Sequence, residues 1–191
     1  FLKDKVKANF FGMDPSANRF KEYYNKKINL ITDYFSFKEI SKNMNYKKTK
    51  KKFSLITSFA MFYDIENPNL FCKDINKLLD KNGLWVLELS YFPLLLKNLT
   101  YDQICHEHIT YYTLTTFKNI ISKNNLKIID LSFNEINGGS VEITCAKIKS
   151  NHKPKEKKIN KIFLDEKKID NHSYERLAKR IDNTKNNSSI R

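Results

Sequence analysis

The sequence predicts an α/β fold with a Rossmann-like sheet that is mostly parallel and has an antiparallel strand pair at its end. Short apolar runs alternate with amphipathic segments, as in parallel sheets with crossover helices. The last two apolar runs, 126–133 and 140–148, are joined by NEINGG, which is too short for a crossover and favours antiparallel pairing. The chain has only four glycines and four prolines, so each one marks a boundary between elements.

The first half of the chain contains three predicted strands. The run NFFGMDP at 9–15 ends in Asp-Pro and indicates a strand stopped by a turn, after which Ser16 caps a predicted helix over 16–25. FSLITSFAMF at 53–62 is apolar on both faces, which predicts a strand buried in a parallel sheet. The other elements of this half are a strand at 28–32, a short helix after it and a lysine-rich loop at 46–52.

The second half continues the alternation and then interrupts it. A helix is predicted over 67–83, ending at Asn-Gly, with one helical stripe formed by Leu70, Phe71, Ile75, Leu78 and Leu79. A strand at 84–90 follows, then an irregular segment at 91–112 and a helix at 114–125. We assign residues 1–150 to one domain, and residues 151–191 to a polar linker with the helical start of a second domain.

Composition narrows the class of protein. A chain of 191 residues with 40% hydrophobic and 13% aromatic residues is globular, and none of its apolar runs reaches the roughly 18–20 residues that span a bilayer. Cys72, Cys105 and Cys145 form no C-x-x-C pair, so neither a disulfide framework nor a cysteine zinc site is indicated. We expect a cytoplasmic protein with no membrane partner.

The net charge of +14 raises the question of a polyanionic partner. The densest cluster, YKKTKKK at 46–52, has no arginine and little aromatic interleaving, whereas nucleic-acid grooves combine arginine contacts with stacking platforms. We therefore interpret the lysines as solvated and expect no nucleic-acid partner. A non-catalytic module that binds polyanions is the alternative from another functional class.

Polar residues end three of the predicted strands. Asp14, Asp33 and Ser58 follow apolar runs, and the carboxyl ends of parallel strands are where such sheets bind ligands. A carboxylate at this place can accept both hydrogen bonds of a ribose diol. The sequence contains no GxGxxG, P-loop or HExxH motif.

The segment YDQICHEHITYY, residues 101–112, gathers proton-transferring groups and has several interpretations. His106 and His108 are two residues apart, which lets them converge on a metal only from an extended segment, and no third ligand has the usual spacing. Cys105 beside His106 could form a thiol–imidazole pair, although sequence neighbours rarely meet in that geometry. His108 near a carboxylate could transfer a proton at neutral pH. A purely structural role in a buried loop is the remaining interpretation.

The motifs ITSFAMFYDIENP, GLWVLELSY, YDQICHEHITYYTL and INGGS, in this order and spacing, resemble the S-adenosylmethionine-dependent C-methyltransferases that act on nucleotide-linked keto-deoxysugars. The resemblance extends over residues 1–150, and the Y-D-x-x-x-H-E-H block is its most specific part. It implies S-adenosylmethionine as cofactor, a nucleotide-linked keto sugar as small-molecule substrate and no metal in the site. Methylation of a non-sugar acceptor on the same fold is the runner-up.

The resemblance also implies catalytic and substrate-binding roles for residues of the histidine-rich block. His108 is the expected general base, with Glu107 shaping the sugar site and His106 completing the catalytic group. Cys105 stands where the family often has a tyrosine, and a thiol is a weaker hydrogen-bond donor than a phenol. Tyr63 stands where the family often has a histidine, and we expect both residues to contact the substrate.

The remaining expected site residues bind the cofactor or the sugar. The resemblance places Asp14 on the cofactor ribose and Asp33 on the adenine side, and we assign Ser58 to the cofactor as well. Asn137 and Gly138 of the INGGS motif are expected to contact the substrate.

The family's zinc-binding module, first sheet strand, glycine-rich turn and C-terminal domain have no counterpart in this sequence, which opens on FLKDKVK. The missing strand would lie between those predicted at 9–14 and 53–59. We therefore expect the 191-residue chain to be a fragment that is inactive on its own, aggregates and binds the cofactor weakly.

Overall fold

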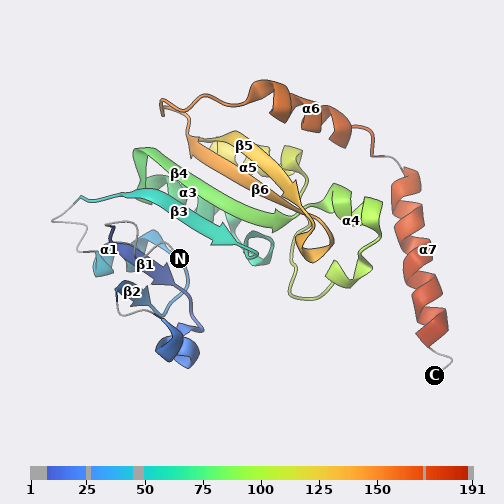
Figure 1. The fold of residues 1–191 in the computed structure, drawn as a ribbon, viewed down its shortest axis with the longest axis horizontal. Coiled ribbons are helices and arrows are strands. Elements are labelled where there is room, and N and C mark those ends of the chain that lie inside the picture. The colour runs from blue at the N-terminus through green and yellow to red at the C-terminus, as the bar shows by residue number, and fades with distance from the viewer. Residues whose placement is uncertain (1–7, 25–26, 45–49, 170, 189–191) are drawn as a thin grey trace. The chain divides into compact units, whose positions relative to one another are not determined.

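Two compact units make up the chain, Phe1–Lys51 and Lys52–Arg191 (Figure 1). The residues that the computed structural model describes are 8–24, 27–44, 50–169 and 171–188. Most of the lysine-rich loop predicted at 46–52 lies outside them. No helix in the described part is long and apolar enough to cross a membrane.

The first unit is built on two parallel strands, β1 (Phe10–Met13) and β2 (Ile28–Ile31). The segment between them forms a 3-10 helix, η1 (Ala17–Tyr23), rather than the longer helix predicted from a Ser16 cap. The serine hydroxyl is engaged elsewhere, because it donates a hydrogen bond of 2.8 Å to Asp14 Oδ1. This bond tightens the Asp-Pro-Ser turn at the end of β1.

A short α-helix completes the first unit. α1 (Phe37–Asn43) begins after Ser36, whose hydroxyl accepts a hydrogen bond of 3.2 Å from the backbone N–H of Glu39. This serine is an N-cap, which satisfies one of the backbone donors that the first turn leaves unpaired.

The second unit contains a four-stranded sheet in the order β3-β4-β6-β5. β3 (Phe53–Phe59) is parallel to β4 (Leu79–Ser90), and β6 (Ser140–Lys147) is antiparallel both to β4 and to β5 (Leu126–Asn134). The α/β fold and the antiparallel terminal pair are therefore confirmed. Among the described residues β1 pairs only with β2 and β3 only with β4, so the two sheets share no hydrogen-bonded strand pair.

Strand β3 is less buried than its composition suggests. The side chains of Leu55 and Phe59 are 50% and 51% exposed, whereas the sequence predicted burial on both faces. The reason is its place in the sheet, since β3 lies at an edge among the described strands.

The helix before β4 is shorter than predicted. α3 (Pro68–Leu78) is capped by Asn67, with proline in its first turn, and it stops at Leu78 rather than at the Asn-Gly pair. The chain leaves the helix there because Leu79 already pairs with Phe53 of β3. β4 therefore starts five residues earlier than the strand predicted at 84–90.

A cluster of aromatic side chains forms the core beneath the candidate site. Phe62 is fully buried in the 3-10 helix η2 (Phe62–Asp64), and its ring centroid lies 5.2 Å from that of Tyr112 and 5.3 Å from that of Phe117. Phe117 belongs to α5 (Leu114–Lys123), which packs beside α3. The cluster fixes η2 against the segment that ends at Tyr112, and both carry predicted site residues.

The segment 91–112, predicted as irregular, contains one more α-helix. α4 (Phe92–Asn98) has Pro93 in its first turn, where the missing proline N–H costs no helical hydrogen bond. It ends at Leu99, which has a left-handed backbone conformation with φ of 55°.

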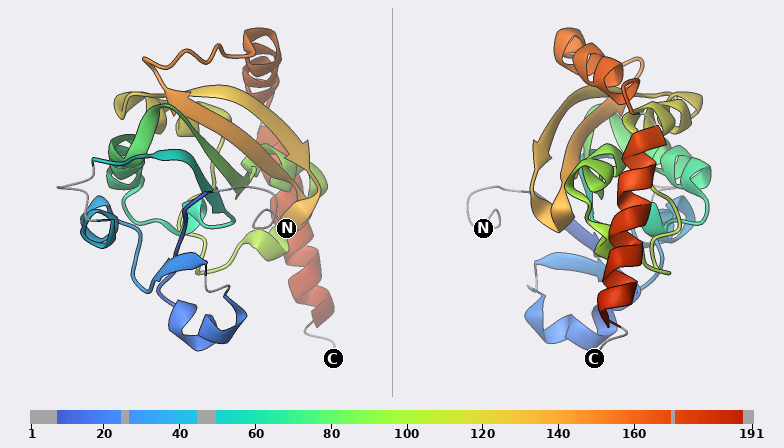
Figure 2. Two further views of the ribbon diagram at one scale, coloured as in Figure 1. Left: turned by 60° about the vertical axis from the view of Figure 1, so that its left-hand side comes forward. Right: turned by 90° about the vertical axis from the view of Figure 1, so that its right-hand side faces the viewer.

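Two helices follow the sheet, α6 (Glu156–Glu166) and α7 (Asn171–Ser188). α6 packs on β5 and α5, and α7 runs alongside α4 (Figures 1 and 2). The predicted polar linker is thus short, because the backbone N–H of Lys155 already bonds to Ile129 of β5 at 2.8 Å. The division at residue 150 into two domains stays a prediction.

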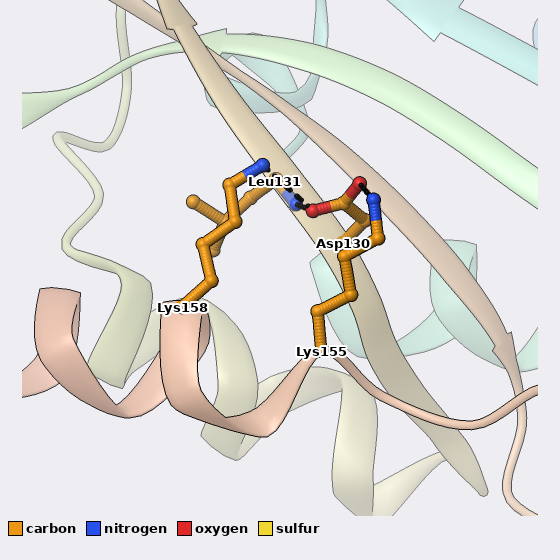
Figure 3. A network of polar contacts seen from close by, with 4 residues as sticks. All are labelled: Asp130, Leu131, Lys155 and Lys158. Atoms are coloured by element: carbon orange, nitrogen blue, oxygen red, sulfur yellow. Dashed lines mark hydrogen bonds and ion pairs between the residues drawn. The ribbon is translucent and has the colours of Figure 1, made fainter.

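An ion-pair network holds the start of α6 against β5. The Asp130 carboxylate accepts hydrogen bonds from Lys155 Nζ, from Lys158 Nζ at 2.8 Å and from the backbone N–H of Leu131 at 2.8 Å (Figure 3). Desolvation acts to raise the pKa of Asp130, but the hydrogen bonds from the two lysines and the backbone outweigh it and lower the pKa to about 2.

This network predicts a pH-dependent part of the stability. The pKa of Asp130 in the folded protein is lower than its ordinary value of 3.8, so unfolding favours protonation. The stabilisation is therefore fully present above about pH 4 and is lost as the pH falls toward about 2. We expect Asp130→Asn to lower the melting temperature at about pH 5 and to match the unsubstituted protein near about pH 2. Glu156→Gln, at an exposed position of the same helix, is the control, and a constant difference for Asp130→Asn across this range would contradict the assignment.

Candidate active site

The histidine-rich segment forms a surface loop between α4 and α5. It begins with a 3-10 helix, η3 (Tyr101–Gln103), and continues into a turn in which His108 N–H bonds to Cys105 O at 3.3 Å. It ends at Tyr112, which is buried, and Thr113 then caps α5. We refer to residues 101–112 as the site loop.

The imidazole of His108 is held in one orientation. Its Nδ1 lies 2.8 Å from the backbone carbonyl oxygen of Gln103. A carbonyl oxygen only accepts hydrogen bonds, so Nδ1 carries the proton in the neutral ring and Nε2 keeps its lone pair. His108 is half-buried, and this tautomer presents Nε2 as a base.

Tyr63 lies directly against this histidine, as expected for two residues of one site. The ring centroids of Tyr63 and His108 are 4.4 Å apart, and Tyr63 O accepts a hydrogen bond of 3.1 Å from Thr110 N–H. Tyr63 is buried, and desolvation raises the pKa of its hydroxyl, with the charges of Asp64 and Glu88 acting in the same direction and a hydrogen bond with Ser90 opposing them. Its phenol is therefore a neutral hydrogen-bond donor beside the imidazole.

Asp64 is a site residue that the sequence analysis missed. It follows Tyr63 in η2, and desolvation raises the pKa of its carboxyl, with Glu107 acting in the same direction and His108 opposing. These couplings place Asp64 within electrostatic reach of both His108 and Glu107. A negative field of this kind stabilises an imidazolium ion once the ring has taken up a proton.

The carboxyl end of β4 contributes a second group that the sequence analysis did not select. Glu88 is buried, and its Oε2 accepts a hydrogen bond of 2.6 Å from Asn134 Nδ2 at the end of β5. Ser90 lies two residues further along β4, and its hydroxyl donates a hydrogen bond of 3.5 Å to Gln103 Oε1. The strand-end argument that selected Ser58 on the neighbouring strand could have found Glu88 too.

The other members of the histidine-rich block lie around the turn. His106 and Glu107 are exposed at its tip, and Cys105 is half-buried. The structure gives no contact between the Cys105 thiol and an imidazole in the described part of the chain, so the predicted roles of these three residues stay predictions. Among the described residues, no three histidine, cysteine or acidic side chains come together in a way that could hold a metal ion.

Asn137 and Gly138 lie next to the start of the site loop. Both have left-handed φ angles, of 52° and 74°, in the 3-10 helix η4 (Ile136–Gly138). A Cβ atom on Gly138 would lie 2.3 Å from Thr100 Cγ2, so glycine is required for this close packing. Gly138 O also accepts a hydrogen bond of 2.7 Å from Asn98 Nδ2. The INGGS motif therefore supports the residues that lead into η3.

The two predicted cofactor aspartates lie in the first unit, at the carboxyl ends of neighbouring parallel strands. Asp14 follows β1 and accepts hydrogen bonds from Ser16 through Oδ1, while Asp33 follows β2 and accepts one from Tyr34 N–H at 2.7 Å, also through Oδ1. In each carboxylate, Oδ2 has no hydrogen-bond partner among the described residues. This arrangement fits the binding of hydroxyl groups such as those of a ribose.

Ser58, the third predicted cofactor residue, lies on β3 in the second unit. Its Oγ accepts a hydrogen bond of 2.8 Å from the indole N–H of Trp85, which is fully buried. The hydroxyl proton is still available to a ligand, and the predicted role of Ser58 stays a prediction.

Comparisons with known sequences and with solved structures both find similarity to methyltransferases. The C-methyltransferase NovU of Streptomyces niveus is 31% identical over 78 residues, which are 41% of this chain and 19% of NovU. The chain thus spans about a fifth of the length of this curated relative. Among solved structures, the putative methyltransferase bound to the Trm112 activator of Haloferax volcanii superimposes with a TM-score of 0.58 at 12% identity. That match covers 76% of this chain and 75% of the other.

The plantazolicin methyltransferase BpumL superimposes with a TM-score of 0.54 at 13% identity, over 76% of this chain and 70% of that one. At such identities these two superpositions show a shared fold. The family described as "Methyltransferase domain" matches residues 1–131, which include both aspartates, Tyr63 and the whole site loop. The chain belongs to this family of methyltransferases.

Proposed function

We propose that the protein transfers a methyl group from S-adenosylmethionine to the carbon next to the keto group of a nucleotide-linked deoxysugar, with His108 as general base. The observation that carries the proposal is the hydrogen bond between His108 Nδ1 and Gln103 O, which leaves Nε2 free to accept a proton. The relationship to a C-methyltransferase supports carbon as the methylated atom.

Carbon must be made nucleophilic before it can be methylated. His108 Nε2 removes the proton next to the ketone, and the electron pair of that C–H bond forms the enolate. The enolate carbon then forms a bond to the methyl group while the bond between that methyl group and sulfur breaks; the electron pair of the broken bond stays on sulfur, so the leaving group would be S-adenosylhomocysteine. His108 later releases its proton to solvent. Bound S-adenosylmethionine supplies an electrophilic methyl group on its sulfonium. A positioned base of this kind contributes typically about 10²–10⁴-fold to the rate.

Neighbouring groups support the proton transfer. The Tyr63 hydroxyl, kept neutral by burial, donates a hydrogen bond to the developing enolate oxygen, and the Cys105 thiol and the Asn137–Gly138 turn contact the sugar. Asp64 and Glu107 stabilise the imidazolium that forms on His108. Asp14 and Asp33 hold the nucleoside part of the cofactor through their Oδ2 atoms, which have no hydrogen-bond partner among the described residues.

Product analysis with a labelled methyl donor tests this proposal. With ¹³C-methyl S-adenosylmethionine and a nucleotide-linked keto-deoxysugar, we expect a product whose new methyl carbon is bonded to a ring carbon in NMR correlation spectra. The matched control is the same sugar with its ketone reduced to an alcohol, which has no acidic C–H and should not react. Methylation of the reduced sugar, or a methyl group on oxygen, would contradict enolate chemistry.

A further inference from the structure

The last residue of α6 is a buried carboxylate that bonds to the far end of the site loop. Glu166 Oε1 accepts hydrogen bonds from the backbone N–H of Leu114 and, at 2.7 Å, from the hydroxyl of Tyr91. Its Oε2 accepts from Thr115 N–H at 3.0 Å and from the Thr115 hydroxyl at 2.6 Å. Glu166 is only 9% exposed, and its bonds to Leu114 and Tyr91 are buried, whereas the two bonds to Thr115 are partly buried.

These bonds are made where the site loop ends. Leu114 and Thr115 are the first residues of α5, whose unpaired N–H groups and positive dipole end favour a carboxylate. Tyr91 lies at the end of β4 and forms a bridge to Tyr112, while Phe92 N–H bonds to Tyr112 O at 3.0 Å. Glu166 therefore joins α5 to the end of β4 at the position where the loop passes between them.

The next helix, α7, contacts the beginning of the same loop. Leu177 is buried with Leu95 and Leu96 of α4, and Tyr101 and Tyr111 of the site loop pack against this cluster. Tyr111 in turn donates a hydrogen bond of 3.3 Å to Gln103 O, the carbonyl oxygen that also holds His108 Nδ1. α6 thus fixes the end of the site loop, and α7 supports the residues that orient His108.

We propose that α6 and α7 act as a clamp that positions the site loop, with Glu166 as its main positioning residue. Both helices lie beyond residues 1–131, which match the methyltransferase family. The catalytic consequence of the clamp rests on the proposed function, because it concerns the orientation of His108. The effect of the clamp on the position of the site loop is independent of the proposed function.

Thiol labelling provides a direct readout of loop position. Cys105 lies on the site loop and is half-buried, whereas Cys72 on α3 and Cys145 on β6 are buried. Burial raises the pKa of Cys72 to about 12 and that of Cys145 well above its ordinary value. The latter two thiols therefore react only when the unit itself opens, and they report unfolding independently of the loop.

The experiment measures maleimide labelling of each cysteine, peptide by peptide, in the natural full-length protein. We expect Glu166→Gln, which keeps the size of the side chain but can accept through one oxygen only, to speed labelling of Cys105 by about tenfold. Cys72 and Cys145 should label at the rate of the unsubstituted protein. Glu156→Gln, at an exposed carboxylate of the same helix, should change none of the three rates. In methyl-transfer assays Glu166→Gln should lower kcat with the KM for cofactor unchanged.

Two results would overturn the proposal: an unchanged Cys105 rate in Glu166→Gln, or an equal acceleration at all three cysteines, which would assign Glu166 to general stability. If Glu166→Gln does not fold, Tyr91→Phe and Leu177→Ala are judged by the same criterion, because they weaken the two arms of the clamp separately. Cysteine labelling requires no methyl acceptor. A failure to detect methyl transfer would therefore count against the proposed function, whereas the labelling rates would still test the clamp.

Discussion

We expect replacement of His108 by glutamine to lower kcat by about 10²–10⁴-fold and to leave the affinity for S-adenosylmethionine nearly unchanged. The glutamine amide can still donate a hydrogen bond to Gln103 O, the contact that His108 Nδ1 makes at 2.8 Å. It has no group that accepts a proton at neutral pH. Steady-state kinetics of the natural full-length protein, together with calorimetric titration of the cofactor, separate these two quantities.

Glu107→Gln is the matched comparison for this substitution. Glu107 is exposed on the same turn, and its charge acts on Asp64, the carboxylate that interacts with His108, so we expect a smaller loss of kcat. If His108→Gln instead weakened cofactor binding and left kcat intact, the histidine would have a structural role and the base would have to be sought elsewhere.

We expect removal of the carboxylate of Asp14 to raise the dissociation constant for S-adenosylmethionine by about tenfold to a hundredfold. A hydrogen bond to a charged group contributes about 1.5–3 kcal/mol, and about 1.4 kcal/mol corresponds to a factor of ten. Asp14 uses Oδ1 for the Ser16 turn and has Oδ2 available for the ribose. Calorimetric titration of Asp14→Asn measures the effect, because asparagine keeps the turn-forming oxygen and removes the charge.

Asp182→Asn, at an exposed position on α7, is the control and should bind the cofactor normally. Asp33→Asn should weaken binding as well, because it lies at the end of the neighbouring strand β2. Unchanged affinity in both the Asp14 and the Asp33 variants would place the nucleoside away from the carboxyl ends of these strands. Turnover at saturating cofactor should survive either substitution.

Hydrophobic patterning predicted the strands and most helices because it reports local burial. The antiparallel pair of β5 and β6 followed from a connection too short for a crossover. Hydrophobic patterning did not predict the correct element boundaries where strand pairing over long range, or the position of a residue within a helix turn, determined the structure. Leu79 looked like the end of a helical stripe but pairs with Phe53, and α4 lies in a segment that was predicted as irregular. The exposure of β3 depends on which strands lie beside it, and its composition does not record that.

The candidate site was also predicted only in part, because local sequence reveals residue types but not backbone contacts or long-range partners. The concentration of proton-transferring residue types pointed to His108, and the family resemblance pointed to Tyr63. The structure places their rings in contact. Gln103 could not be found this way, because it acts through its backbone carbonyl and any residue type supplies one. Asp64 lies between the predicted strand at 53–62 and the predicted helix at 67–83, so no strand-end or helix pattern singled it out. Glu166 is 52 residues from Leu114, its backbone donor, and sits in a stretch predicted as polar helix, so no local pattern linked it to the site loop.

Deuterium exchange at the carbon next to the ketone tests the central claim most directly, since it isolates proton removal from methyl transfer. The protein is mixed in deuterated water with a nucleotide-linked keto-deoxysugar and S-adenosylhomocysteine, which carries no methyl group to transfer. We predict that the unsubstituted protein and the control His172→Gln, at an exposed position on α7, incorporate deuterium at that carbon, and that His108→Gln loses this exchange. Exchange by His108→Gln at the rate of the unsubstituted protein would contradict the assignment of His108 as the general base.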